Sequence, residues 1–261
     1  MKRLLIAGLA LALLVPACAL AQSALNGTWV TQLGSVKGFG KPFVIHLKDG
    51  MYECNCAPPI KVKADGQDHA VTGHPGFDTV AVKVLDDHSI QETDKKDGKT
   101  VSTTTVTAAA DGKTATYEFT DSSGTSPVTG KAVVERVAKG PAGANAVAGS
   151  WKFGHWENMS DNGRTFTYKV DGKQVSFSDP TGDSYAAEIG GKAVPYTGGG
   201  MSGVTVSVKK DGKDGLRETF MYDGKVTHTN TMTVSADGKT MKSVSHNVQA
   251  GRTSTMLADK Q

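Results

Sequence analysis

The sequence predicts an all-β protein made of two tandem antiparallel up-and-down β-barrels, each with about eight or nine strands. Three observations support this fold class. Short segments of the first half recur in the second half, apolar residues alternate with polar ones at every second position, and the dipeptide Asp-Gly separates the alternating segments. No segment shows the sustained periodicity of an amphipathic helix.

The repeat predicts the domain organisation. Four segments of the first half recur in the second: Gly27-Thr28-Trp29 as Gly149-Ser150-Trp151, Glu92-Thr93 as Glu218-Thr219, Asp97-Gly98-Lys99 as Asp223-Gly224-Lys225, and Asp111 to Thr114 as Asp237 to Thr240. The last three share an offset of 126 residues, which is far longer than a solenoid repeat and indicates two copies of a whole domain. We therefore expect a first barrel over residues 24–137, an Ala- and Gly-rich linker over residues 138–146 and a second barrel over residues 147–261.

Alternation with a period of two residues marks the strands. Phe43, Ile45 and Leu47 share one strand face in the first copy, and the second copy has the same pattern at Val204, Val206 and Val208. Asp-Gly follows or precedes such segments, for example at residues 49–50, 97–98 and 223–224, and favours type I′ hairpin turns because both central residues need a positive φ.

A meander of this many strands, without helices to cover an open sheet, removes its exposed edges by closing into a barrel. A β-sandwich is the alternative that these patterns leave open.

The N-terminus has the pattern of an export signal. Lys2-Arg3 precede an apolar run over Leu4 to Val15, and Ala19-Leu20-Ala21 offers a small-x-small cleavage site. We expect residues 1–21 to be a signal peptide and the mature protein to be periplasmic or secreted, without a transmembrane segment. Lipidation of Cys18 is the alternative, because Val15 to Cys18 form a partial lipobox.

Charge excludes some partners. Loss of residues 1–21 removes two basic residues and lowers the net charge from +3 to about +1. A nearly neutral protein has no electrostatic reason to bind nucleic acid or an anionic membrane. About 240 residues remain, which is enough for two independently stable cores, and we expect a monomer.

Cys54 and Cys56 are the only cysteines that remain after export. On one regular strand their Cα atoms would lie about 6.5–7 Å apart, at the limit of disulfide geometry, and the bend at Ala57-Pro58-Pro59 could bring them closer. We expect a disulfide between them. Two free thiols, or a metal or redox site with only two local ligands, are the alternatives.

Five residues are candidates for a ligand-binding site: His155, Trp156, His228, Asn230 and Met232. His155 and Trp156 follow Trp151 closely and could line a site for haem or an aromatic ligand, with ordinary packing at a barrel end as the alternative. His228, Asn230 and Met232 share a strand face, which forms a polar cavity wall if it points inward and an outer face if it does not.

The sequence contains no pattern typical of an enzyme or a metal site. Its seven histidines form no metal-ligand motif, and His69 and His74 fall in a turn that we expect to be solvated. Gly198 to Gly200 lack the lysine of a phosphate loop, and no Gly-x-Ser-x-Gly occurs. We therefore expect no enzymatic activity, no cofactor and no bound metal.

Gly-x-Trp at the first strand of both copies resembles the signature of the lipocalins and other calycins. The stretch from Asp65 to Val106, the segments AEIGGKAVPYTGGG and VSADGKT, and the closing Asp-Lys-Gln look similar to exported bacterial proteins of unassigned function that are described as lipocalin-like. The resemblance covers nearly all of residues 24–261. It implies the barrel fold and export, and it supplies no catalytic residues.

We expect an exported, non-enzymatic binding module for a small apolar or amphipathic molecule in the bacterial envelope, because an eight-stranded barrel is just wide enough for one small ligand. The alternative is a structural or protein-interaction factor of the periplasm with filled barrels and no ligand. Trp29 and Trp151 should be buried packing residues, each in the barrel of its own copy, with the indole N–H bonded to an acceptor.

Overall fold

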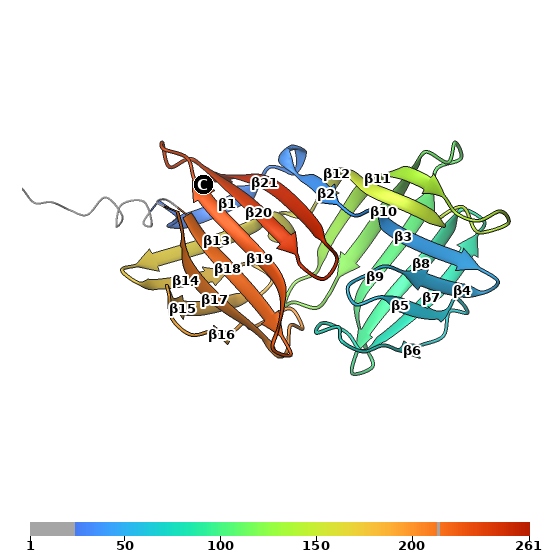
Figure 1. The fold of residues 1–261 in the computed structure, drawn as a ribbon, viewed down its shortest axis with the longest axis horizontal. Coiled ribbons are helices and arrows are strands. Elements are labelled where there is room, and N and C mark those ends of the chain that lie inside the picture. The colour runs from blue at the N-terminus through green and yellow to red at the C-terminus, as the bar shows by residue number, and fades with distance from the viewer. Residues whose placement is uncertain (1–23, 213–214) are drawn as a thin grey trace, which may run out of the picture.

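The protein folds into two nearly closed antiparallel barrels of ten strands each, which confirms the predicted fold class. The computed structural model describes residues 24–212 and 215–261, and the two barrels lie side by side along its longest axis (Figure 1). The expected signal peptide and the lipidation alternative at Cys18 fall on residues outside the described ones.

The first barrel has the strand order β5-β4-β3-β12-β11-β10-β9-β8-β7-β6. Its strands are β3 (Phe43–Lys48), β4 (Met51–Cys54), β5 (Ile60–Lys63), β6 (His69–Ala70), β7 (Thr79–Asp86), β8 (Ser89–Lys96), β9 (Lys99–Ala108), β10 (Thr114–Asp121), β11 (Val128–Lys139) and β12 (Gly149–Met159). All ten come from one continuous segment of the chain.

The second barrel has the strand order β15-β14-β13-β1-β21-β20-β19-β18-β17-β16. Its strands are β1 (Gly27–Thr31), β13 (Thr165–Asp171), β14 (Gln174–Ser178), β15 (Ser184–Glu188), β16 (Val194–Pro195), β17 (Val204–Asp211), β18 (Gly215–Tyr222), β19 (Lys225–Val234), β20 (Thr240–Asn247) and β21 (Arg252–Lys260). A short strand β2 (Lys37–Gly40) pairs with β21, and two short helices, η1 (Leu33–Ser35) and α2 (Asp161–Arg164), lie in the connections.

The two copies exchange their first strands. β1 pairs with β13 and β21, so Trp29 lies opposite Phe166 and Lys260. β12 pairs with β3 and β11, so Trp151 lies opposite Phe43 and Arg136. In Figure 1 the blue β1 accordingly belongs to the barrel formed otherwise by yellow, orange and red strands.

The exchange corrects the expected domain boundaries. The barrels are not the contiguous segments 24–137 and 147–261. The first barrel consists of residues 43–159, and in the sequence these residues are inserted between β1 and the other strands of the second barrel. The reason is physical: both copies begin with the same Gly-x-Trp strand, and such a strand can bond to the next strand of either copy.

Each exchanged strand is anchored by its tryptophan. Trp29 is fully buried and its Nε1 donates to the carbonyl of Leu25 at 2.9 Å. Trp151 is 1% exposed and its Nε1 donates to the carbonyl of Val147 at 3.0 Å. The prediction of buried packing with a satisfied N–H is confirmed, whereas the assignment of each tryptophan to its own copy's barrel is wrong.

A cation covers each indole ring. The guanidinium carbon of Arg136 lies 3.9 Å from the centre of the Trp151 ring, and Nζ of Lys260 lies 5.1 Å from the centre of the Trp29 ring. Cation–π contacts of this kind add to the burial of the ring.

The expected linker is held in place rather than loose. β11 extends to Lys139, and Arg136 donates from Nη1 to the carbonyl of Ala148 at 2.8 Å and from Nη2 to that of Ala146 at 2.6 Å. Val147 and Ala148 are buried in the core of the first barrel. The expected linker therefore consists of the end of β11 and part of the connection to β12, two strands of one barrel, and does not separate two barrels.

The turns and strand faces follow the sequence pattern. Asp49, Asp97 and Asp223 have φ values of 52°, 50° and 50°, each followed by a glycine of positive φ, as a type I′ turn requires. Ile45 and Leu47 are buried on the predicted inner face, and so are Val204, Val206 and Val208.

We expect the fragment 42–160 to fold on its own, because it contains all ten strands of the first barrel. The fragment 160–261 lacks β1, leaves β13 and β21 with unpaired edges and should not fold alone. Circular dichroism and gel filtration of both fragments check this, with a synthetic peptide of residues 24–41 added to restore the second. An unfolded 42–160 fragment, or a 160–261 fragment that folds without the peptide, would show that the exchange is not the native topology.

Trp29→Ala should destabilise the second barrel, although Trp29 belongs to the first copy. Truncating a buried tryptophan removes about 3–5 kcal/mol of stability. Hydrogen exchange should accelerate in β13 and β21 while β3 and β11 keep their protection. Trp151→Ala is the matched control and should have the opposite pattern.

Candidate functional site

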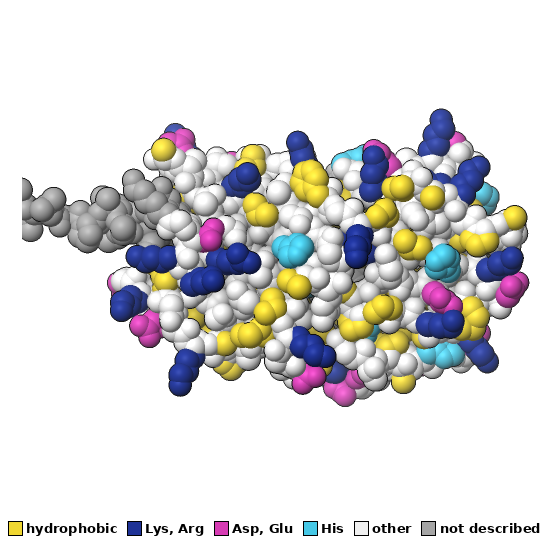
Figure 2. All heavy atoms as spheres, viewed as in Figure 1, with side chains coloured by type: hydrophobic (Ala, Val, Ile, Leu, Met, Phe, Trp, Pro, Cys, Tyr) yellow, Lys and Arg dark blue, Asp and Glu magenta, His cyan; other side chains and the backbone are white. Residues whose placement is uncertain are grey.

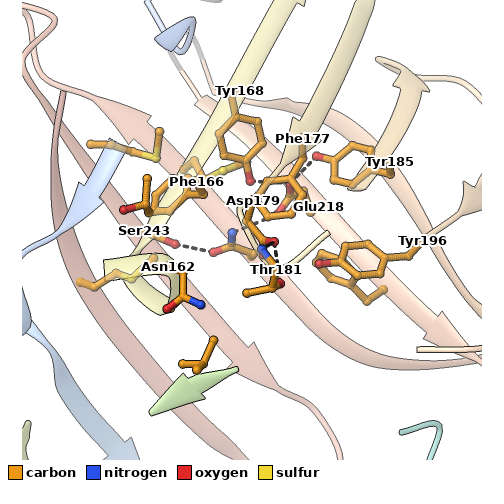
Figure 3. A pocket seen from close by; sticks show the side chains of 18 of the residues that line it. Asn162, Phe166, Tyr168, Phe177, Asp179, Thr181, Tyr185, Tyr196, Glu218 and Ser243 are labelled. Carbon is orange, nitrogen blue, oxygen red and sulfur yellow. Dashed lines mark hydrogen bonds between the residues drawn. The ribbon is translucent and has the colours of Figure 1, made fainter. Parts of the chain in front are cut away.

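The second barrel encloses a cavity of about 390 Å³ (Figure 3). Its walls are mostly apolar and aromatic side chains of β13, β14, β18, β19, β20 and β21. A buried carboxylate, Glu218, lies among them on β18 and is 2% exposed.

Glu218 accepts hydrogen bonds from three side chains. Oε1 accepts from the hydroxyl of Tyr168 at 2.7 Å and from the hydroxyl of Tyr185. Oε2 accepts from Nδ2 of Asn230 at 3.0 Å, and Asn230 Oδ1 in turn accepts from the hydroxyl of Ser243. Figure 3 shows both tyrosine hydroxyls directed at the carboxylate. These hydrogen bonds offset the free-energy cost of burying the Glu218 carboxylate.

Burial dominates the electrostatics of this cluster. It raises the pKa of the Glu218 carboxyl above its ordinary value, and the hydrogen bonds from Tyr185, Asn230 and Tyr168 act in the opposite direction. Burial and the neighbouring Glu218 raise the pKa of Tyr168 and Tyr185 as well, so both tyrosines remain neutral donors.

Aromatic rings line the wall beside the carboxylate. Phe177 stacks on Tyr185 with 5.8 Å between ring centres and 16° between planes, and on Tyr196 with 6.2 Å and 27°. Tyr196 meets Phe220 edge to face at 5.7 Å. Such rings offer a negative π face to a ligand.

The first copy forms the mouth of this cavity together with α2. Asp121 and Val128 line the cavity together with Asp179 and Thr181, and Thr125 N–H donates to the carbonyl of Thr181 at 2.7 Å. Three acidic residues, Asp121, Asp179 and Glu218, line the cavity, and no lysine, arginine or histidine among the described residues does. The cavity is therefore electronegative.

The first barrel has the corresponding carboxylate but different surroundings. Glu92 stands at the position of Glu218, 126 residues earlier. Burial raises its pKa, and the Tyr52 hydroxyl opposes that rise. By the same offset Asp94 replaces Phe220 and Tyr117 replaces Ser243. Tyr117 is larger than Ser243, which lines the cavity of the second barrel.

The predicted site residues lie in three places. Asn230 and Met232 line the cavity of the second barrel, so this part of the mixed face of β19 is an inner face, whereas His228 on the same face is exposed. Trp156 and His228 line a separate cleft between the barrels. His155 is exposed, and the cavity and cleft residues do not include it.

The cysteines and the two turn histidines are in the first barrel. Cys54 and Cys56 form a disulfide with Cα atoms 5.2 Å apart. His69 lies 2.9 Å from Asp65 and is partly exposed. The expectation of a solvated turn is wrong for His74, which is 7% exposed and stacks on Phe77 at 4.4 Å. Burial lowers the pKa of His74.

Sequence reasoning missed Glu218 and its tyrosines as site residues. Glu218 lies two residues from both Leu216 and Phe220, so the three side chains share one face of the strand. The two-residue period therefore already places Glu218 on the inner face. The recurrence of Glu92-Thr93 as Glu218-Thr219 is a second signal that an inward carboxylate belongs to both copies.

Comparison with models of known protein families finds no match, and a search of curated proteins finds none either. The architecture is compatible with a lipocalin-like fold. Within residues 24–212 and 215–261, no helix is long and apolar enough to cross a membrane, and no three His, Cys, Asp or Glu side chains are grouped to hold a metal ion. Figure 2 shows basic and acidic side chains interspersed over both barrels on the face drawn.

Asp94→Asn should stabilise the protein above neutral pH. Burial, with Glu92 and Asp121, raises the pKa of Asp94 from 3.8 to about 7, and its Oδ1 has no hydrogen-bond partner among the described residues. At a pH between the unfolded-state pKa of 3.8 and the folded-state pKa of about 7, Asp94 has lost its proton in the unfolded chain and keeps it in the folded chain. The free energy of unfolding therefore falls as the pH rises through this range.

The substitution should remove this pH dependence and add about 1–3 kcal/mol at pH 8, with little effect at pH 4. Denaturant unfolding at several pH values measures it. Asp97→Asn, in an exposed turn, is the control. An unchanged pH profile in Asp94→Asn would contradict the assignment.

Proposed function

We propose that this chain is an exported, non-enzymatic binding protein that holds one small amphipathic molecule in the second barrel. The observation that carries the proposal is the cavity of about 390 Å³ with apolar walls and one hydrogen-bonded carboxylate cluster. Its volume lies in the usual range for small-molecule sites, and its few polar groups converge at one place, as ligand pockets require.

The lining favours a ligand whose polar end donates hydrogen bonds or carries positive charge. Glu218, Asp121 and Asp179 supply negative charge, and the tyrosine and phenylalanine rings supply π faces that attract cations. The apolar body of the ligand would lie against Met232, Met241 and the aromatic wall.

The hydrogen-bonded cluster around Glu218 is better suited to binding a ligand than to catalysis. The carboxylate of Glu218 already accepts three hydrogen bonds from the protein, which fixes it as an anchor rather than a mobile proton carrier. Export to the periplasm or beyond is part of the same proposal and rests on the N-terminal signal pattern.

The test uses three ligands with one tail and different heads: octylammonium, octanol and octanoate. Calorimetry should find that octylammonium binds the second barrel most tightly. Glu218→Gln should weaken octylammonium about tenfold and leave octanol nearly unchanged, because only the charged head uses the carboxylate.

Glu92→Gln is the matched control in the first copy and should leave octylammonium binding unchanged. Native mass spectrometry of protein purified from its own host should also show a retained small molecule. Absence of both a retained molecule and any binding of the three probes would favour the alternative, a structural factor with filled barrels.

A further inference from the structure

A second cavity lies between the barrels. It has a volume of about 760 Å³ and is the mouth of the first barrel, covered by β2 and by residues of β19, β20 and β21. It is separate from the cavity around Glu218, because the two share no lining residue. We call it the inter-barrel cleft.

Aromatic side chains form one wall of the inter-barrel cleft. Phe119, Phe153 and Trp156 lie together there, with 5.9 Å between the rings of Phe119 and Trp156 and 5.8 Å between those of Phe153 and Trp156. Phe39 of β2 also lines the cleft and is 55% exposed. A wall of this kind suits the apolar body of a ligand.

The charge of the cleft is the reverse of that in the second barrel. Its charged lining residues are Lys41, Lys152 and Arg252, with His228 beside them, and none of its lining residues is Asp or Glu. Lys152 is paired with Glu135 at 3.0 Å on the protein surface. Lys41 is exposed, whereas Arg252 is partly buried in the wall of the cleft. We therefore take Arg252 as the cation of the cleft.

Arg252 is held in a fixed position. Its Nε donates to the carbonyl of Lys41 at 3.2 Å, and its Nη2 donates to Asn55 Oδ1 at 2.8 Å. Its guanidinium carbon lies 5.3 Å from the centre of the Phe43 ring. Nη1 has no hydrogen-bond partner among the residues that the structure describes, so two N–H groups are available to an acceptor.

The hydroxyl of Tyr117 is also unpartnered. It is buried, it belongs to a cleft-lining residue, and it has no hydrogen-bond partner among the described residues. Burial raises the pKa of Tyr117, and nearby Arg252 acts in the opposite direction. A buried donor without a partner loses free energy that a ligand acceptor would restore.

Two carboxyl groups, Glu92 and Asp94, lie within the first barrel behind Tyr117. Burial raises the pKa of both, and the hydrogen bond from Tyr52 opposes the rise at Glu92. The pKa of Asp94 reaches about 7, so below that pH Asp94 is mostly neutral and repels an anion in the cleft less.

We propose that the inter-barrel cleft binds a small organic anion with an apolar body, its acidic head held by Arg252 and Tyr117 and its body against Phe119, Phe153 and Trp156. The protein would then have two sites of opposite charge preference, one in each barrel mouth.

Tryptophan fluorescence gives a readout confined to this site. Trp29 and Trp151 are fully buried, and Trp156 is the tryptophan that lines the cleft. Octanoate should shift the emission and bind about tenfold more tightly than octanol, because a charge-assisted hydrogen bond adds to the same tail contact. Trp156→Phe should abolish the optical response while calorimetry still detects octanoate.

Arg252→Gln and Tyr117→Phe should each weaken octanoate several-fold and leave octanol unchanged. Tyr117→Phe removes only the unpartnered hydroxyl, so it decides the question if Arg252→Gln fails to fold. Octyl phosphate, tested in parallel, shows whether the site prefers a carboxylate or a phosphate head. Glu218→Gln should change octylammonium binding alone, which separates failure of this site from failure of the site in the second barrel.

Equal affinity for octanoate and octanol in the wild-type protein would overturn the proposal. So would octanoate binding that neither Arg252→Gln nor Tyr117→Phe affects.

Discussion

The rest of the structure depends on one constraint, which is that each barrel closes with the first strand of the other copy. β1 fills the gap between β13 and β21, and β12 fills the corresponding gap between β3 and β11. In both places a buried tryptophan donates its N–H to a carbonyl four residues earlier and lies under a cation. The two barrels therefore form one interlocked unit, in which neither copy of the repeat completes its own barrel.

The exchange also determines where the cavities open. The chain crosses from one barrel to the other after β2 and again after β12, so segments of each copy lie at the mouth of the other. Asp121 and Val128 of the first copy border the electronegative cavity around Glu218, and Arg252 of the second copy borders the inter-barrel cleft. The linings of the two cavities therefore differ in charge: acidic residues line one, and Lys41, Lys152 and Arg252 line the other.

The sequence predicted the elements well because they depend on local patterns. Alternation placed Ile45 and Leu47 inside, and Asp-Gly placed the turn at residues 49–50. The exchange could not be predicted, since Gly27-Thr28-Trp29 and Gly149-Ser150-Trp151 fit either barrel and the choice depends on contacts between distant residues. The sequence predicted only part of the candidate site, because some of its contacts also join distant residues. The face shared by Asn230 and Met232 is visible in the strand period, whereas the meeting of Tyr168 and Tyr185 at Glu218 requires the three-dimensional fold.

A paired-cysteine experiment tests the exchange most directly. Thr28 and Thr167 lie opposite each other with their hydroxyl oxygens 3.0 Å apart, while Ser150 occupies the place beside Val44 that Thr28 would take in a contiguous barrel. In a chain with Cys54 and Cys56 replaced by serine, Thr28→Cys with Thr167→Cys should form an intramolecular disulfide under mild oxidation, and Thr28→Cys with Val44→Cys should not. Peptide mapping by mass spectrometry identifies the linked pair in the monomer. A bond between positions 28 and 44, without one between 28 and 167, would contradict the exchanged topology.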